Sequence, residues 1–196
     1  LKKFPSSIAI INEKAKKYWL IDITPEIKTQ IQMIDQFDCS LEGIFITHAH
    51  IGHYMGLINL GLEVMNSKNI PVYVMPKMKN FIIQNSFLNQ LVENNNIKLS
   101  LITDGVDINI NNHFSIKAFD VPHRNELSET VGYRIMGEEL LRENRYEEVA
   151  NPETVEMSDV RNYIFLEYDG TYTENSIITD HELDLVIKFH SGCNMY

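Results

Sequence analysis

Three of the seven histidines in the chain lie within six consecutive residues, directly after a short apolar run. That run, GIFIT at residues 43–47, is typical of a strand buried on both faces. His48 and His50 are two residues apart, so an extended backbone places both side chains on one face. His53 follows in a segment expected to be helical, and it can point back from the other side. The apolar run followed by histidines predicts a buried strand in a sheet covered by helices, with the histidines at the end of that strand.

Histidines at this spacing indicate a metal site. Neutral imidazole is a common ligand of zinc and also serves iron and nickel. A strand end holds such ligands rigidly, while the loop after it leaves room for water or substrate. An isolated histidine usually only forms hydrogen bonds, but three so close together after a buried strand favour a metal ion. A pH-sensitive histidine cluster is the alternative interpretation.

The rest of the chain alternates between strand-like and helical patterns. Apolar runs predict strands at residues 7–12, 18–23, 71–74, 97–102, 106–110, 114–120, 131–135, 163–168 and 183–189. The three strands between residues 97 and 120 are expected to be consecutive in a meander. Helices are predicted from Thr24-Pro25 to about residue 36, and over residues 54–66, 76–93 and 138–149. Such alternation, with antiparallel meanders, predicts mixed sheets covered by helices.

Composition narrows the class of protein. The chain has 196 residues, which suits one domain, and its net charge of -10 argues against binding to nucleic acid or to anionic membranes. The longest apolar runs are far shorter than the roughly 20 residues of a membrane span. Its two cysteines, Cys39 and Cys193, have no neighbour at ligand spacing, and the start of the chain shows no secretory signal. A reduced, cytoplasmic setting is therefore expected.

The histidine segment resembles the signature of the metallo-β-lactamase superfamily, usually His-x-His-x-Asp-His. Two other segments resemble landmarks of that superfamily in the same order. Leu20-Ile21-Asp22 is similar to its early strand-ending aspartate, and VPHR at residues 121–124 is similar to the segment that donates a further histidine. More narrowly, residues 47–57 and 121–135 resemble the group around pyrroloquinoline-quinone biosynthesis protein B. The resemblance covers about residues 5–135, and residues 136–196 match it poorly.

The resemblance implies an α/β (α+β) fold and a particular set of ligands. The fold would be a four-layer αβ/βα sandwich of two mixed β-sheets, in a single domain over residues 1–196. His48, His50 and His123 would form a first metal site with an open position for water. His53 would belong to a second metal site, and Asp22 would support the histidine loop structurally.

The sequence also departs from the superfamily pattern. Gly52 stands where the superfamily usually has an aspartate that binds the second metal and accepts a proton, so a weaker second site is expected. Asp169 is the best positional candidate for the metal-bridging, catalytic aspartate, although an Asp-Gly turn explains it equally well. Arg124 and Glu126 flank His123 and would either orient a substrate or form a surface ion pair. The remaining histidines are expected to be solvated or terminal: His113, His181 and His190.

The expected function is metal-assisted hydrolysis of an ester, amide, lactone, thioester or phosphoester in a small-molecule substrate. The cofactor would be one or two divalent metal ions, zinc first, with iron or manganese as alternatives. Two other functions remain possible. One is an iron-dependent oxidoreductase similar to the group around pyrroloquinoline-quinone biosynthesis protein B, and the other is a binding domain that has lost catalytic activity. A homo-oligomer is compatible with the sequence.

Overall fold

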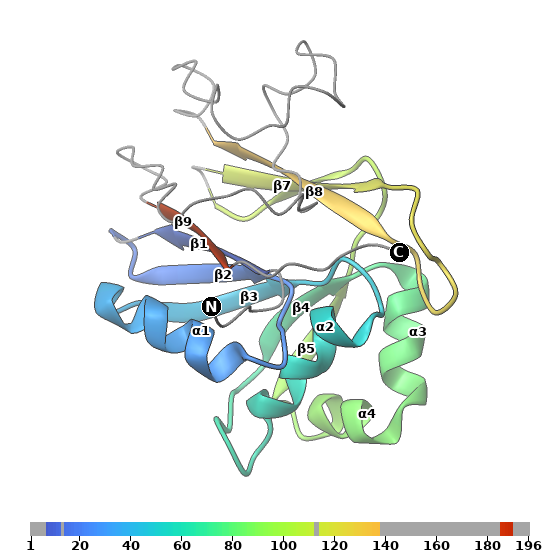
Figure 1. Ribbon diagram of the computed structural model, residues 1–196, viewed down its shortest axis with the longest axis horizontal. Helices are drawn as coiled ribbons and strands as arrows, with labels where there is room; N and C mark the ends of the chain where they lie inside the picture. Colours follow the sequence, from blue (N-terminus) through green and yellow to red (C-terminus); the bar gives the residue numbers. More distant parts are fainter. Residues whose placement is uncertain (1–6, 13, 112–113, 138–184, 190–196) are drawn as a thin grey trace, which may run out of the picture.

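Two β-sheets and a layer of helices make up the computed structural model, which describes residues 7–12, 14–111, 114–137 and 185–189. Figure 1 shows the helices below the larger sheet and the smaller sheet above it. Over these residues the larger sheet has six strands in the order β5-β4-β3-β2-β1-β9, and the smaller has three in the order β6-β7-β8. The strands are β1 (Ser7–Asn12), β2 (Lys17–Ile21), β3 (Ser40–Phe45), β4 (Ile70–Val74), β5 (Ile97–Leu101), β6 (Asp107–Asn109), β7 (Phe114–Asp120), β8 (Val131–Gly137) and β9 (Leu185–Phe189). The α-helices are α1 (Ile27–Ile34), α2 (Ile51–Tyr54), α3 (Pro76–Gln84) and α4 (Ser86–Glu93), with 3₁₀ turns η1 (Asp35–Phe37) and η2 (Met55–Leu60).

The larger sheet is mixed, as expected, while the smaller sheet is antiparallel over the described residues. Strands β2, β3, β4 and β5 run parallel to one another, and β1 pairs antiparallel with both β2 and β9. One prediction is wrong: residues 97–120 do not form a single meander. β5 pairs in parallel with β4, and only β6, β7 and β8 pair as a meander. The reason is burial, since Ile97 of β5 packs in the core between the larger sheet and the helices.

Strands β1 and β2 of the larger sheet are buried on both faces, and their side chains alternate between two hydrophobic cores. In β1, Ala9 and Ile11 belong to the core shared with the helices, whereas Ile8 and Ile10 face the smaller sheet. The core between the sheets also contains Phe45, whose ring stacks on Tyr73 and meets Tyr133 edge-on, with ring centroids 4.3 and 5.5 Å apart. This packing fixes the smaller sheet relative to the end of β3.

Helix boundaries differ slightly from the sequence pattern. Helix α1 begins at Ile27, with Glu26 rather than Thr24 at the N-cap, although the Thr24 hydroxyl accepts a hydrogen bond from the Glu26 amide. The helix predicted over residues 76–93 is broken at Asn85 into α3 and α4. The predicted elements at 138–149 and 163–168 lie outside the described residues. In the part of the chain that the structure describes, no helix is long and apolar enough to cross a membrane.

Candidate metal centre

The candidate site lies beyond the carboxyl end of β3, where the chain leaves the larger sheet. His48 and His50 follow this strand, and His123 comes from the connection between β7 and β8. One ring nitrogen of each of these three histidines lies within 4.8 Å of the others. Two nitrogens bound to one tetrahedral zinc lie roughly 3.3 Å apart, given Zn–N bonds of about 2.0–2.1 Å. Small ring rotations therefore suffice to place the three nitrogens on one ion.

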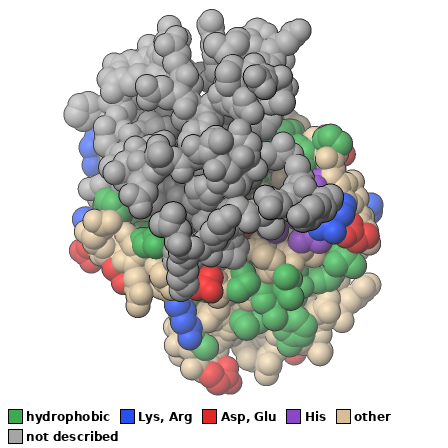
Figure 2. Space-filling view, viewed as in Figure 1, with side chains coloured by type: hydrophobic (Ala, Val, Ile, Leu, Met, Phe, Trp, Pro, Cys, Tyr) green, Lys and Arg blue, Asp and Glu red, His purple; other side chains and the backbone are tan. Residues whose placement is uncertain are grey.

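The imidazole rings of the three histidines also pack closely against one another. The centroid of His48 lies 4.6 Å from that of His50 and 5.1 Å from that of His123, and the rings are nearly perpendicular in both pairs. Figure 2 shows histidine side chains reaching the surface of the molecule, with a group of hydrophobic side chains below them. The cluster is thus held by the protein on one side and open to solvent on another.

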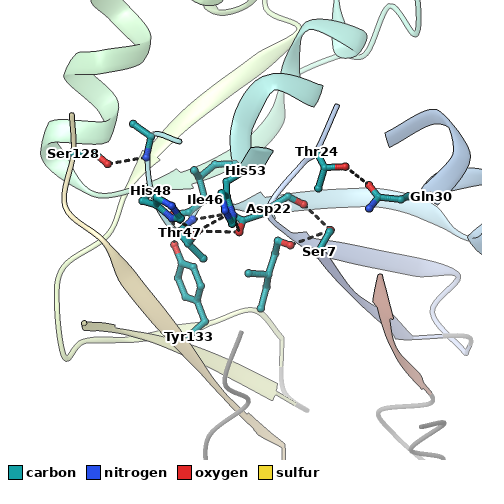
Figure 3. Close-up of polar contacts among 12 residues, drawn as sticks. Ser7, Asp22, Thr24, Gln30, Ile46, Thr47, His48, His53, Ser128 and Tyr133 are labelled. Carbon is teal, nitrogen blue, oxygen red and sulfur yellow. Dashed lines mark hydrogen bonds and ion pairs between the residues drawn. The ribbon is translucent and has the colours of Figure 1, made fainter. Parts of the chain in front are cut away.

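Asp22 organises the histidine loop from the end of β2. It adopts a left-handed backbone conformation, with φ of 62°, and only 2% of its surface is exposed. Its amide donates to the carbonyl of Phe45, while its carboxylate accepts hydrogen bonds from the amide and the hydroxyl of Thr47 at 2.8 Å. Figure 3 shows this carboxylate between Thr47 and His53. The structure therefore places Asp22 where the sequence predicts a supporting residue.

The hydrogen bonds of Thr47 determine which nitrogen of His48 carries a proton. A carboxylate can only accept, so the Thr47 hydroxyl donates its proton to Asp22. The hydroxyl oxygen lies 2.8 Å from Nδ1 of His48 and must then accept a hydrogen bond from the N–H group at that nitrogen. His48 is therefore protonated on Nδ1, and its Nε2 keeps a lone pair. Support of a ligand histidine through its second nitrogen is typical of metal sites in proteins.

The Nε2 atom of His48 is buried and has no hydrogen-bond partner among the residues that the structure describes. Buried polar atoms without a partner are rare and costly, so this one calls for an explanation. Burial, and the positive charges that His53, His50, His123 and Arg124 can carry, lower the pKa of His48 to about 2. The ring is thus neutral at physiological pH. A neutral imidazole with an unpaired nitrogen beside two further histidines fits a divalent cation.

His53 lies against His48, with ring centroids 4.1 Å apart. Its Nδ1 is 2.6 Å from Oδ2 of Asp22. Burial lowers the pKa of His53, but the negative charge of Asp22 and the hydrogen bond to it outweigh burial and raise that pKa overall. His53 is therefore next to the triad without belonging to the group of three close nitrogens.

Glu126 contacts a predicted ligand directly. Its Oε1 lies 2.8 Å from Nε2 of His50, and this hydrogen bond is the largest cause of a lowered pKa for the Glu126 carboxyl. The sequence predicts that Glu126 binds substrate or forms a surface ion pair, and the structure pairs it with a histidine of the cluster. Arg124 lies close enough to His48 to lower its pKa by charge.

Two further contacts join the histidine loop to the β7–β8 connection. The amide of Ala49 donates to the hydroxyl of Ser128 at 2.9 Å, and the amide of Val131 donates to the carbonyl of Thr47 at 3.1 Å. Behind them, the Tyr133 hydroxyl donates to the carbonyl of Ile46 at 2.8 Å. These contacts fix His123 relative to the other two histidines. No sequence signal singled out Ser128 or Tyr133, because each is an ordinary residue until the two sheets are packed.

The remaining predicted site residues fall into two groups. Gly52 lies in α2, and a Cβ added there would meet nothing within 4 Å. Its surroundings therefore leave space for the aspartate of the superfamily pattern. The other candidates lie outside the described residues: Asp169, His113, His181 and His190.

Comparison with solved structures identifies the fold. The Zn(2+)-bound PqqB from Methylobacterium extorquens matches 67% of this chain and 49% of its own chain, at 19% identity and a TM-score of 0.55. The chain has the metallo-β-lactamase fold. This confirms the fold predicted from the sequence, and PqqB is the protein whose group residues 47–57 and 121–135 resemble. At this level of identity the likeness concerns the fold alone.

Other metallo-β-lactamase-fold and related structures match with lower scores. The short form of human tRNase Z matches 64% of this chain at 19% identity and a TM-score of 0.44. FEZ-1 metallo-β-lactamase from Legionella gormanii matches 68% at 13% identity and a TM-score of 0.47. The chain spans about half the length of these solved structures, between 49% and 55%. No protein-family model and no curated protein sequence matches it.

Proposed function

We propose that this metallo-β-lactamase-fold chain is a zinc-dependent hydrolase. The observation that carries the proposal is the buried Nε2 of His48, which has no hydrogen-bond partner among the described residues. His48 also belongs to a group of three histidines in which one ring nitrogen of each lies within 4.8 Å of the others. A cation explains why this buried nitrogen is tolerated, since coordination replaces the missing hydrogen bond. Three nitrogen ligands that leave a position open are also the arrangement of catalytic rather than structural zinc sites.

The residues of the chain would divide the work as follows. His48, His50 and His123 would hold the ion, and Asp22 would keep His48 in the required protonation state through Thr47. When bound, zinc supplies Lewis acidity towards the scissile oxygen and a water that is activated at neutral pH. The described residues place the side chain of Asp22 on Thr47 and His53, so a general base is expected elsewhere. Asp169, which the sequence suggests for this role, lies outside the described residues.

Metal content tests the ligand assignment. Protein purified without added metal is analysed by elemental analysis and then titrated with zinc. We expect His48→Ala and His123→Ala each to lose most of the bound metal, because either substitution reduces the number of histidine ligands from three to two. The matched controls are His113→Ala and His181→Ala, which remove histidines expected to be solvated and should retain it. Equal retention in all four variants would refute the assignment.

Activity separates hydrolysis from the rival functions. Phosphodiester, lactone and thioester substrates are screened with zinc, manganese and iron, and oxygen consumption is followed in parallel. Zinc-dependent turnover that His48→Ala abolishes supports the hydrolase. Bound iron with oxygen consumption would instead establish an oxidoreductase, and metal binding without any turnover would establish a binding domain.

A further inference from the structure

His50 has one ring nitrogen at Glu126 and the other left for the cluster. Nε2 of His50 lies 2.8 Å from Oε1 of Glu126. A carboxylate only accepts hydrogen bonds, so Nε2 must carry the proton in this pair. In the neutral ring the lone pair then resides on Nδ1. The contact therefore fixes the protonated nitrogen and, by holding Nε2 at Glu126, the orientation of the ring.

The two strand-end histidines are thus supported in parallel ways from opposite sides. His48 donates from Nδ1 towards Asp22 through the hydroxyl of Thr47, which leaves Nε2 available. His50 donates from Nε2 to Glu126, which leaves Nδ1 available. Each carboxylate selects the nitrogen that its histidine needs.

Glu126 belongs to the same connection as His123, three residues further along the chain. We propose that Glu126 is a positioning residue for the metal site, which orients His50 so that Nδ1 faces the cation, rather than a substrate-binding residue. One connection, between β7 and β8, then contributes both a ligand and the group that orients a second ligand beyond the end of β3. This inference rests on the proposed zinc site.

The exposure of Glu126 separates two effects of its removal, one on zinc affinity and one on the stability of the fold. Half of its side chain is exposed, compared with 20% for His50. A pair this close to solvent contributes little to the stability of the fold. Hydrogen-bond partners of ligand histidines, in contrast, change metal affinity by about 10- to 100-fold when they are removed. A positioning role therefore predicts a large effect on zinc affinity and a small one on unfolding.

The test compares Glu126→Ala, Glu126→Gln and wild type in two measurements. Zinc affinity is measured by competition with a chromophoric chelator, and urea unfolding is followed without metal. We expect Glu126→Ala to lose zinc affinity by about tenfold or more with its unfolding midpoint almost unchanged. Glu126→Gln retains a carbonyl oxygen that accepts from Nε2 and should recover part of the affinity. The matched control is Glu129→Ala, since the Glu129 carboxylate accepts from the Lys77 amide instead.

A second readout does not depend on metal. Nitrogen-15 shifts of the His50 ring in metal-free protein report which nitrogen is protonated and whether it is hydrogen-bonded. We expect them to differ between wild type and Glu126→Ala and to be unchanged in Glu129→Ala. Identical shifts and equal zinc affinity in wild type and Glu126→Ala would overturn the inference. If wild type binds no zinc, the proposed function fails, and the ring shifts still decide whether Glu126 orients His50.

Discussion

At the scale of single residues, the hydroxyl of Thr47 is the group on which the state of His48 depends. It donates to Asp22 and accepts from Nδ1 of His48, both at 2.8 Å. Because the Asp22 carboxylate takes the hydroxyl proton of Thr47 in a hydrogen bond, the hydroxyl oxygen must accept from His48. Asp22 thus determines which ring nitrogen of His48 is protonated through Thr47. Without it, His48 loses the partner that keeps the proton on Nδ1.

We therefore predict that Thr47→Val lowers zinc affinity by about 10- to 100-fold, the usual effect of removing the partner of a ligand histidine. The free energy of unfolding should fall by about 1–3 kcal/mol, because buried polar atoms lose their partners. Thr47→Ser keeps the hydroxyl and should resemble wild type. Chelator competition and urea unfolding measure the two effects, and a Thr47→Val variant with wild-type zinc affinity would contradict the proposed link.

Gly52 allows a second prediction at this scale. A Cβ at this position meets no atom within 4 Å, so an aspartate fits without displacing its surroundings. Gly52→Asp should increase zinc stoichiometry at saturation, because it supplies a carboxylate beside His53. Gly52→Asn has the same shape without the charge and serves as the control. Unchanged stoichiometry in Gly52→Asp would show that the missing aspartate is not what weakens the second site.

The sequence could locate the candidate site because histidines that bind a metal ion have a recognisable spacing. The segment around His48 and His50 identified a candidate site, and the structure brings His123 to it from a distant stretch. The roles of Thr47 and Glu126 could not be predicted, since a hydrogen bond depends on rotamers and on loops meeting in space. A threonine or glutamate on a loop has no periodic signature.

At the scale of elements, the important junction joins the end of β3 to the β7–β8 connection. The hydroxyl of Ser128 accepts from the Ala49 amide at 2.9 Å, and both residues are buried. Ala49 lies between His48 and His50, beyond the end of β3, so this segment is attached to the connection that carries His123. The junction thereby aligns candidate ligands that come from different sheets.

We predict that Ser128→Ala lowers the free energy of unfolding by about 1–3 kcal/mol, because the buried Ala49 amide loses its acceptor. Zinc affinity should fall as well, since the loop can then shift relative to His123. Ser86→Ala, at an exposed serine, is the control and should change both quantities little. Urea unfolding and zinc titration measure the effects. A variant as stable as wild type would mean that water or another group satisfies the Ala49 amide.

Most elements could be predicted from hydrophobic periodicity, and the errors have physical causes. The strand predicted at residues 7–12 has the same bounds as β1, because β-branched residues coincide there with burial of every side chain. The partner of β5 was wrong because periodicity identifies a strand without saying which neighbour it pairs with. The break at Asn85 was missed because asparagine is tolerated within a helix and only weakly disfavours it.

At the scale of the whole molecule, the proposed ligands connect the two sheets. His48 and His50 extend from the larger sheet, and His123 lies in a connection of the smaller one. A shared ion would add a link between sheets that otherwise pack through the core around Phe45 and Tyr133. Metal binding and the stability of the sandwich should therefore be coupled.

We predict that zinc at about 100 times its dissociation constant stabilises the protein by about 2.7 kcal/mol, provided that the unfolded chain binds little zinc. The melting temperature should rise by roughly 5–10 °C for a chain of this size. His123→Ala should abolish most of the rise, because it removes the ligand from the smaller sheet. Thermal unfolding with and without zinc measures the shift. A rise of equal size in His123→Ala would show that the ion does not join the sheets.

The positions of the histidines along the chain also bear on when an ion would be captured. His48, His50 and His53 are neighbours before any folding occurs, whereas His123 is synthesised 70 residues after His53. For a chain that binds zinc as proposed, the growing polypeptide would offer a loose chelating stretch early and the final ligand only after the sandwich closes. Loading would begin during translation and tighten at the last step of folding, so metal supply in the cell would influence the yield of finished protein.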